Sequence, residues 1–155
     1  MPMIVVLDAG PLGLASQARG KPDADRCRLW IQTLDALGTR VVVPEIADYE
    51  VRRELIRVGA TTGIGRLEQL EAVLDYDPIT TLTMRRAAEL WALVRRAGIP
   101  TADPHALDGD CILAAQASLL GGPDDVVKIA TTNVRHLGRF PGVNAQAWDS
   151  MKSGS

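Results

Sequence analysis

The chain has 155 residues, of which 46% are apolar and 23% are charged, a composition that indicates one globular domain whose core needs no disulfide staple. The formal net charge of −2 excludes a strongly basic nucleic-acid-binding protein, although the 17 basic residues are mostly arginines, which suit phosphate. No apolar run is long enough to cross a membrane, and no basic segment precedes the apolar residues 3–7. We therefore expect a cytoplasmic protein without a signal peptide.

Short β-branched runs predict strands, and apolar stripes of helical period predict the helices between them. The expected strands are residues 3–7, 40–43, 79–82 and 126–131, with a small extended segment near 147–148. The expected helices are a short one ending near Ala15, one between Asp23 and Gly38, residues 45–58 and 62–74, one capped by Thr83, residues 107–120, and residues 134–137. Two cysteines, Cys27 and Cys111, lack the spacing of metal ligands and fall on apolar helix faces, so we expect both to be buried.

Strands that alternate with helices favour a parallel sheet with helices on both faces. The fold class we expect is therefore α/β, a three-layer α/β/α sandwich around a central, mainly parallel sheet. Residues 1–149 form one domain in this interpretation, and the polar residues 150–155 form a flexible tail. Ligands of such sheets bind at the carboxyl ends of the strands, which here follow Leu7, Val43 and Ala130.

Acidic side chains are placed at or near these ends. Asp8 directly follows the first strand, and Glu50 lies in the helix after the second strand. Asp108 and Asp110 lie in what we expect to be the first turn of the most apolar helix, and Asn133 follows the last clear strand. Carboxylates held together repel each other, and a hard divalent cation such as Mg²⁺ relieves that repulsion. The pattern therefore indicates a metal site that could activate water.

Each acid also has a simpler explanation. Asp8, Asp108 and Asp110 could cap helices, because the helix dipole favours acids near its N-terminus. Glu50 could be a solvated helix residue, and Glu54, one turn later, could take its place. The combination of acids at one sheet edge carries the metal interpretation, rather than any single residue.

Four segments resemble the motifs of PIN-domain nucleases, in the order found in that family. Residues 7–12 are similar to the first motif, with Asp8, and residues 44–50 are similar to the second, which ends at Glu50. Residues 107–117 are similar to the third, where an aspartate opens an alanine-rich helix, and residues 129–133 are similar to the fourth. The chain also resembles bacterial VapC-type toxins and stand-alone PIN proteins in size.

This resemblance implies a Mg²⁺- or Mn²⁺-dependent endoribonuclease that hydrolyses phosphodiester bonds in RNA, with Asp8, Glu50 and Asp110 as acidic metal ligands. Asp108 would be an extra ligand or the base that accepts a proton from the attacking water, and Thr131 would organise the acids by hydrogen bonding. Possible partners implied by the family are a small antitoxin protein and a second copy of the chain. Arginines near the site would position phosphate; the candidates are Arg52, Arg53, Arg57, Arg135 and Arg139.

The fourth motif departs from the family, because Asn133 stands where an acid is usual. An amide oxygen can bind Mg²⁺ but brings no charge, so a catalytically weak or inactive module that binds RNA or a protein partner stays an alternative. His105 and His136 are weaker candidate ligands, and both are more typical of surface histidines. A phosphatase with Asp8 as nucleophile is disfavoured because Gly10 stands where such enzymes carry a second aspartate.

Overall fold

The computed structural model describes residues 3–98 and 104–151 of the chain. The sequence predicts a loop at residues 99–106, and residues 99–103 of it lie outside the described part, as do the residues after 151 and the side chain of His105.

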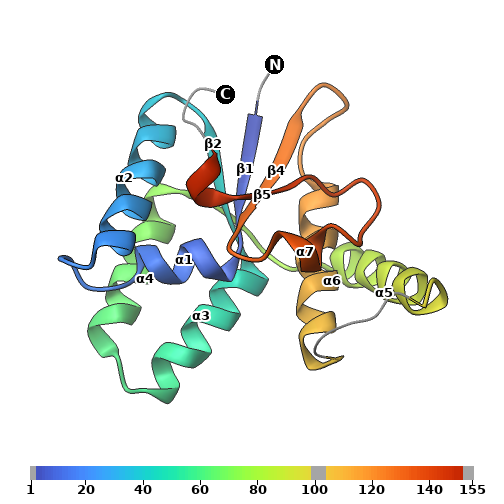
Figure 1. The fold of residues 1–155 in the computed structure, drawn as a ribbon, viewed down its shortest axis with the longest axis horizontal. Coiled ribbons are helices and arrows are strands. Elements are labelled where there is room, and N and C mark those ends of the chain that lie inside the picture. The colour runs from blue at the N-terminus through green and yellow to red at the C-terminus, as the bar shows by residue number, and fades with distance from the viewer. Residues whose placement is uncertain (1–2, 99–103, 152–155) are drawn as a thin grey trace.

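A five-stranded sheet in the order β3-β2-β1-β4-β5 forms the centre of the molecule (Figure 1). Its strands are β1 (Met3–Leu7), β2 (Arg40–Pro44), β3 (Asp75–Asp77), β4 (Val126–Thr131) and β5 (Ala145–Ala147). Every neighbouring pair is parallel, which confirms the predicted sheet. The middle strand β1 is almost wholly apolar and buried because helices cover both faces of the sheet.

Helices pack on both faces of the sheet and complete the predicted three-layer sandwich (Figure 1). One layer contains α1 (Ala9–Ala15), α2 (Pro22–Ala36), α3 (Glu45–Arg57) and α4 (Thr61–Val73). The other contains α5 (Thr81–Arg96) and α6 (Pro104–Leu119), and the short α7 (Val134–Leu137) follows β4. Alternate residues of β1 divide between two cores, with Val5 facing the first layer and Val6 the second. Cys27 and Cys111 are buried and free, as predicted.

Two predictions about residues 75–83 are wrong. The strand expected at 79–82 is wrong: β3 is Asp75–Asp77, and the Ile79 N–H instead donates to a carboxylate oxygen of Glu45 at 2.8 Å. The cap expected at Thr83 is also wrong, because Thr80 caps α5 and Thr83 is its partner in a reciprocal capping box.

The helix that carries Asp108 and Asp110 begins earlier than predicted. It starts at Pro104 instead of residue 107, so the two acids lie beyond its first turn. Helix-dipole capping therefore does not account for them, because the effect falls off within the first turn.

The end of the described chain packs on the first helical layer. A short 3₁₀ helix, Trp148–Ser150, leads to Met151, and both Trp148 and Met151 are buried in the same core as α2. The division between a domain ending at 149 and a tail stays a prediction. In the described ranges no helix is long and apolar enough to span a bilayer.

Candidate functional site

The two strands at the centre of the site end side by side. β1 pairs with β2 on one side and with β4 on the other, and the chain passes from β1 to β2 before it reaches β4. The strand order therefore reverses between β1 and β4, and sheets of this kind bind ligands at the carboxyl ends of the strands at such a point. Leu7 pairs with Ala130, and the Asp8 N–H donates to the Ala130 carbonyl at 3.0 Å. The next side chains, Asp8 and Thr131, therefore meet: the Thr131 hydroxyl donates to Oδ2 of Asp8 at 2.7 Å.

Glu50 approaches Asp8 and Asp110 from α3, and the charges of both act on it. Its carboxylate lies over Gly109 of α6, where a Cβ would stand 3.6 Å from the carboxylate carbon and both oxygens. Burial, with added repulsion from the charges of Asp8 and Asp110, raises the pKa of Glu50 to about 7. A buried carboxyl whose pKa is raised next to other acids is a candidate functional group.

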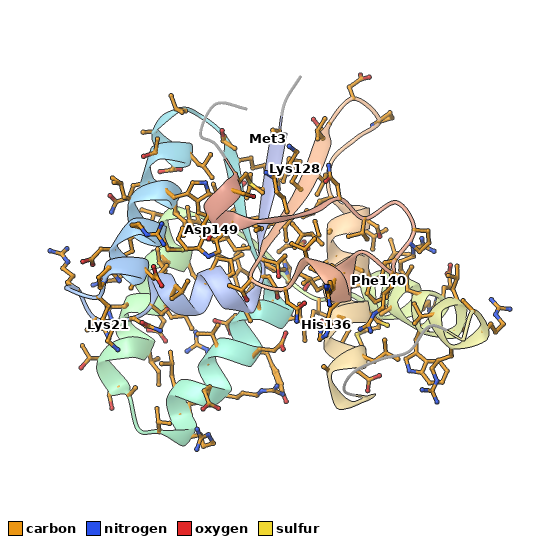
Figure 2. All side chains as sticks on the ribbon, viewed as in Figure 1. Met3, Lys21, Lys128, His136, Phe140 and Asp149 are labelled. Atoms are coloured by element: carbon orange, nitrogen blue, oxygen red, sulfur yellow. The ribbon has the colours of Figure 1, made fainter. Side chains whose placement is uncertain are left out.

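Asp110 approaches from α6 and is paired with a cation. Arg139 Nη2 donates to its Oδ2 at 2.7 Å, and His136 Nδ1 lies 3.8 Å from the same oxygen. Burial and the charge of Asp8 raise the pKa of Asp110, although Arg139 and His136 oppose the shift. Figure 2 shows His136 on α7, beside the end of the sheet that carries the acids. His136, considered a surface residue from the sequence, is therefore half-buried next to a site acid.

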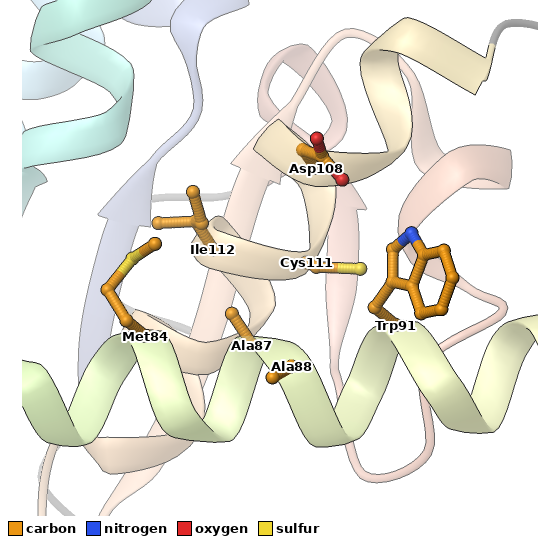
Figure 3. Close-up of a pocket in the computed structure, with 7 residues that line it drawn as sticks. All are labelled: Met84, Ala87, Ala88, Trp91, Asp108, Cys111 and Ile112. Carbon is orange, nitrogen blue, oxygen red and sulfur yellow. The ribbon is translucent and has the colours of Figure 1, made fainter.

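Asp108 lies on a different side of α6. It is exposed and lines two hollows, one with Glu50 and Arg53 and another between α5 and α6. The second hollow is apolar apart from Asp108, with Trp91 and Cys111 among its walls (Figure 3). Asp108 thus shares a groove with Glu50, but the main charges that raise the pKa of Glu50 and of Asp110 are those of other acids.

Asn133 and Thr131 are linked through the backbone. The Asn133 N–H donates to the Thr131 hydroxyl at 2.9 Å, so Thr131 accepts from Asn133 while it donates to Asp8. The Asn133 side chain is exposed and makes no capping bond to α7.

Several candidate phosphate-binding arginines are engaged elsewhere. Arg52 bonds to three acids of α3 and α4, namely Asp48, Glu68 and Glu71. Arg57 pairs with Glu54 on the exposed side of α3, although Glu54 also lines a hollow with Glu50. Arg52 and Arg57 are therefore both paired with acids of their own surface, and a role for them in binding phosphate stays a prediction.

Arg53 is the arginine best placed beside the acids. Its guanidinium lies 5.0 Å from the centre of the Tyr49 ring, and its charge acts on Glu50. Arg135 is exposed on α7. A groove of about 390 Å³ runs past Glu50 between α3 and α6. Its described lining residues are Ile46, Tyr49, Glu50, Arg53, Ala106, Asp108, Gly109 and Ile112.

A family comparison decides what this arrangement is. The PIN-domain family profile matches residues 5–137, a span that includes Asp8, Glu50 and Asp110. The chain belongs to the PIN-domain family. A search of curated proteins gave no match.

Solved structures with the same fold accord with this PIN-domain assignment. VapBC2 from Rickettsia felis, bound to a DNA fragment from its promoter, superposes with a TM-score of 0.69 at 15% identity, covering 95% of this chain and all (100%) of the other. DNA-bound VapBC from Salmonella typhimurium gives 0.64 at 19% identity, covering 96% and 99%. FitAcB from Neisseria gonorrhoeae gives 0.65 at 18% identity, covering 95% and 99%. At these identities the likeness shows the fold alone.

The acids of this PIN domain fit a divalent cation in the chemistry of their donors. Asp8, Glu50 and Asp110 offer only oxygen atoms, and Mg²⁺ and Mn²⁺ prefer oxygen ligands. No three Asp, Glu, His or Cys side chains in the described ranges already stand in metal-binding geometry. An ion that keeps several of its waters needs fewer direct protein ligands, as Mg²⁺ commonly does.

Sequence reasoning missed a residue that positions the PIN-domain acids. Gln116 of α6 is fully buried; its Oε1 accepts from the Ile46 N–H at the start of α3, and its Nε2 donates to the Asp77 carbonyl at 2.7 Å. One side chain thus fixes α6, which carries Asp110, against α3, which carries Glu50. The signal was present, because Gln116 is a polar residue inside an otherwise apolar helical run.

Proposed function

We propose that this PIN domain is a Mg²⁺- or Mn²⁺-dependent endoribonuclease that hydrolyses phosphodiester bonds in RNA. The observation that carries the proposal is the convergence of Asp8, Glu50 and Asp110 near the carboxyl ends of β1 and β4, where Thr131 bonds to Asp8 and the charges of Asp8 and Asp110 help to raise the pKa of Glu50. A protein gains no stability from such repulsion, so the arrangement fits a cation site. PIN-domain proteins are nucleases as a family, which supports the same activity.

In this proposal Asp8, Glu50 and Asp110 hold the ion, directly or through water. When bound, the ion lowers the pKa of a water molecule and offsets charge on the phosphodiester. Thr131 keeps Asp8 oriented, and Asp108, exposed in the groove beside Glu50, accepts the proton released by the attacking water.

The groove between α3 and α6 is the proposed path of the RNA. Arg53 supplies a positive charge for a phosphate next to Glu50. The Tyr49 ring beneath it is half exposed and offers a surface on which an unpaired base can stack.

The test is cleavage of single-stranded and structured RNA by the purified protein in Mg²⁺ and in Mn²⁺, with chelator as a control. Asp110→Asn and Glu50→Gln should each abolish cleavage without unfolding the protein. The matched controls are Asp124→Asn, an exposed acid before β4, and Glu54→Gln, one helical turn from Glu50; both should cleave normally. Equal cleavage by wild type and by folded Asp110→Asn would reject the proposal.

We further propose that the protein is the toxin of a toxin–antitoxin pair. Solved structures with the same fold include VapBC complexes and FitAcB, and the chain covers nearly all of each of these matched chains. Expression together with the small protein encoded next to its gene should yield a complex in which RNA cleavage is suppressed. Light scattering of the free protein would test the homodimer that the family resemblance implies.

A module that binds RNA without cutting it is the second candidate. Asn133 favours it, because this exposed amide brings no charge to the fourth motif. Metal binding and RNA binding without cleavage under any condition would support this candidate. Restoration of cleavage by Asn133→Asp would then identify the missing charge as the cause.

A further inference from the structure

Arg139 is an unusual neighbour for a candidate metal ligand. Its side chain is only 7% exposed, and Nη2 donates to Oδ2 of Asp110 at 2.7 Å. Its Nε is also buried and has no hydrogen-bond partner. A buried guanidinium is costly unless an anion compensates it, so Arg139 depends on Asp110. Arg139 therefore does not face solvent as a phosphate-binding residue, which corrects the expectation from the sequence.

The pairing changes the charge of the site. The ionised carboxylates of Asp8, Glu50 and Asp110 carry three negative charges, and the buried guanidinium offsets one of them. A single divalent ion balances the two that remain. A cation that binds Asp110 is also repelled by the positive charge of Arg139, which is bound to the same carboxylate. Because the surroundings are partly buried, this repulsion is screened less than it would be in water.

We propose that Arg139 is an internal cation that competes with a divalent metal ion for Asp110, so that the site holds its metal more weakly than its carboxylates alone would. The inference rests on the proposed metal-dependent function. The segment after α7, which carries Arg139, would then control metal affinity, whereas the acids would bind the metal.

The main competing role for Arg139 predicts the opposite result. If Arg139 only oriented Asp110 for the metal, its removal would weaken metal binding, as loss of an outer-sphere partner commonly does by about 10- to 100-fold. Competition predicts tighter binding after removal. The sign of the change in affinity therefore separates the two roles.

The experiment measures Mn²⁺ binding by isothermal titration calorimetry on the metal-free full chain, without RNA. Arg139→Gln removes the charge and keeps a polar side chain; it should bind Mn²⁺ about tenfold more tightly than wild type, given the size of Coulomb terms at such sites. The matched control is Arg135→Gln, which removes the same charge from an exposed position on α7 and should bind within about twofold of wild type. Mn²⁺ should also raise the Tm of Arg139→Gln more than that of wild type.

Equal or weaker Mn²⁺ binding by Arg139→Gln would overturn the inference and make Arg139 an orienting residue. If that variant does not fold, Arg139→Lys serves, because lysine keeps the charge but lacks the planar fork. If Arg139→Lys binds Mn²⁺ within about threefold of wild type, the result would support competition by charge. A tenfold loss of Mn²⁺ affinity in Arg139→Lys would overturn it. If wild type binds no divalent ion at all, the proposed metal-dependent function fails, which is a different result from metal binding without a gain in Arg139→Gln.

Discussion

The Thr131 hydroxyl donates a 2.7 Å hydrogen bond to Oδ2 of Asp8, and so joins two side chains that are 123 positions apart in the sequence. The other carboxylate oxygen of Asp8 accepts from the Ala9 N–H, also at 2.7 Å. Both oxygens are thus held before any ligand arrives. Since Thr131 accepts in turn from the Asn133 N–H, the position of Asp8 is tied to the loop after β4.

Thr131→Val should impair the site more than the fold. Valine matches threonine in shape but cannot donate to Asp8 or accept from Asn133, so we expect a loss of about 1–3 kcal/mol in the free energy of unfolding. We also expect RNA cleavage to fall at least about tenfold, because a misplaced catalytic group is costly. Urea unfolding and initial cleavage rates measure the two effects. Thr62→Val, an exposed site on α4, is the control; equal losses in both variants would show that the Asp8 bond is unimportant.

Rising pH should destabilise the metal-free protein. Burial and the charges of Asp8 and Asp110 raise the pKa of Glu50 from 4.5 to about 7, so the folded state binds the proton more strongly than the unfolded chain. This contribution is fully present below about pH 4.5 and is lost as pH rises through 7. The measurement is Tm as a function of pH between 4 and 8, in chelator, for wild type and for Glu50→Gln.

The difference between the two proteins isolates Glu50. Glu71, whose pKa is also raised by burial and by its hydrogen bond with Asp48, gives a slope of the same sign in both proteins. Glu50→Gln should therefore show a shallower fall in Tm between pH 4.5 and 7, and Mg²⁺ should flatten the wild-type profile. Parallel profiles would mean that Glu50 does not titrate in this range.

The sequence was sufficient to predict the central strands but not the edge strand β3. β1 is apolar and almost wholly buried, and β4 is rich in β-branched residues with its last three residues buried, so their composition was enough to predict them. β3 consists of Asp75, Tyr76 and Asp77, which carry no strand pattern; the segment is a strand because it pairs with the edge of β2. Pairing with a distant strand is tertiary information that local composition does not contain.

The same limit applies to the candidate site. Asp8 could be located from the sequence because it directly follows a buried strand, and a parallel sheet fixes where such a residue lies. The pairing of Asp110 with Arg139 could not be inferred, because they are 29 positions apart and no periodic pattern relates α6 to the segment after α7. Which arginines stay free also depends on partners such as Glu68, which lies on a different helix from Arg52.

Gln116→Leu should destabilise the protein strongly. Leucine fills the space but leaves the Ile46 N–H and the Asp77 carbonyl without their partner, at a cost of about 2–4 kcal/mol for two buried groups. Urea unfolding of this variant and of Ser118→Ala, an exposed change two residues later on α6, gives the comparison. In the folded fraction, Mn²⁺ affinity should also fall, because α3 and α6 lose a common anchor. Stability equal to that of Ser118→Ala would contradict this role.

Gly10→Ala should disturb the junction between α1 and β4. A Cβ at Gly10 would stand 2.5 Å from the Thr132 hydroxyl oxygen, which is closer than van der Waals contact allows, so Thr132, which directly follows β4, must shift. We expect a loss of about 1–3 kcal/mol in the free energy of unfolding from this overpacking, and weaker RNA cleavage because Thr131 moves with its neighbour. The control is Gly65→Ala within α4, where a Cβ meets nothing within 4 Å and alanine should instead stabilise the helix by about 0.5–1 kcal/mol. Opposite signs in the two variants, measured by urea unfolding, would support the close approach, whereas stabilisation in both would contradict it.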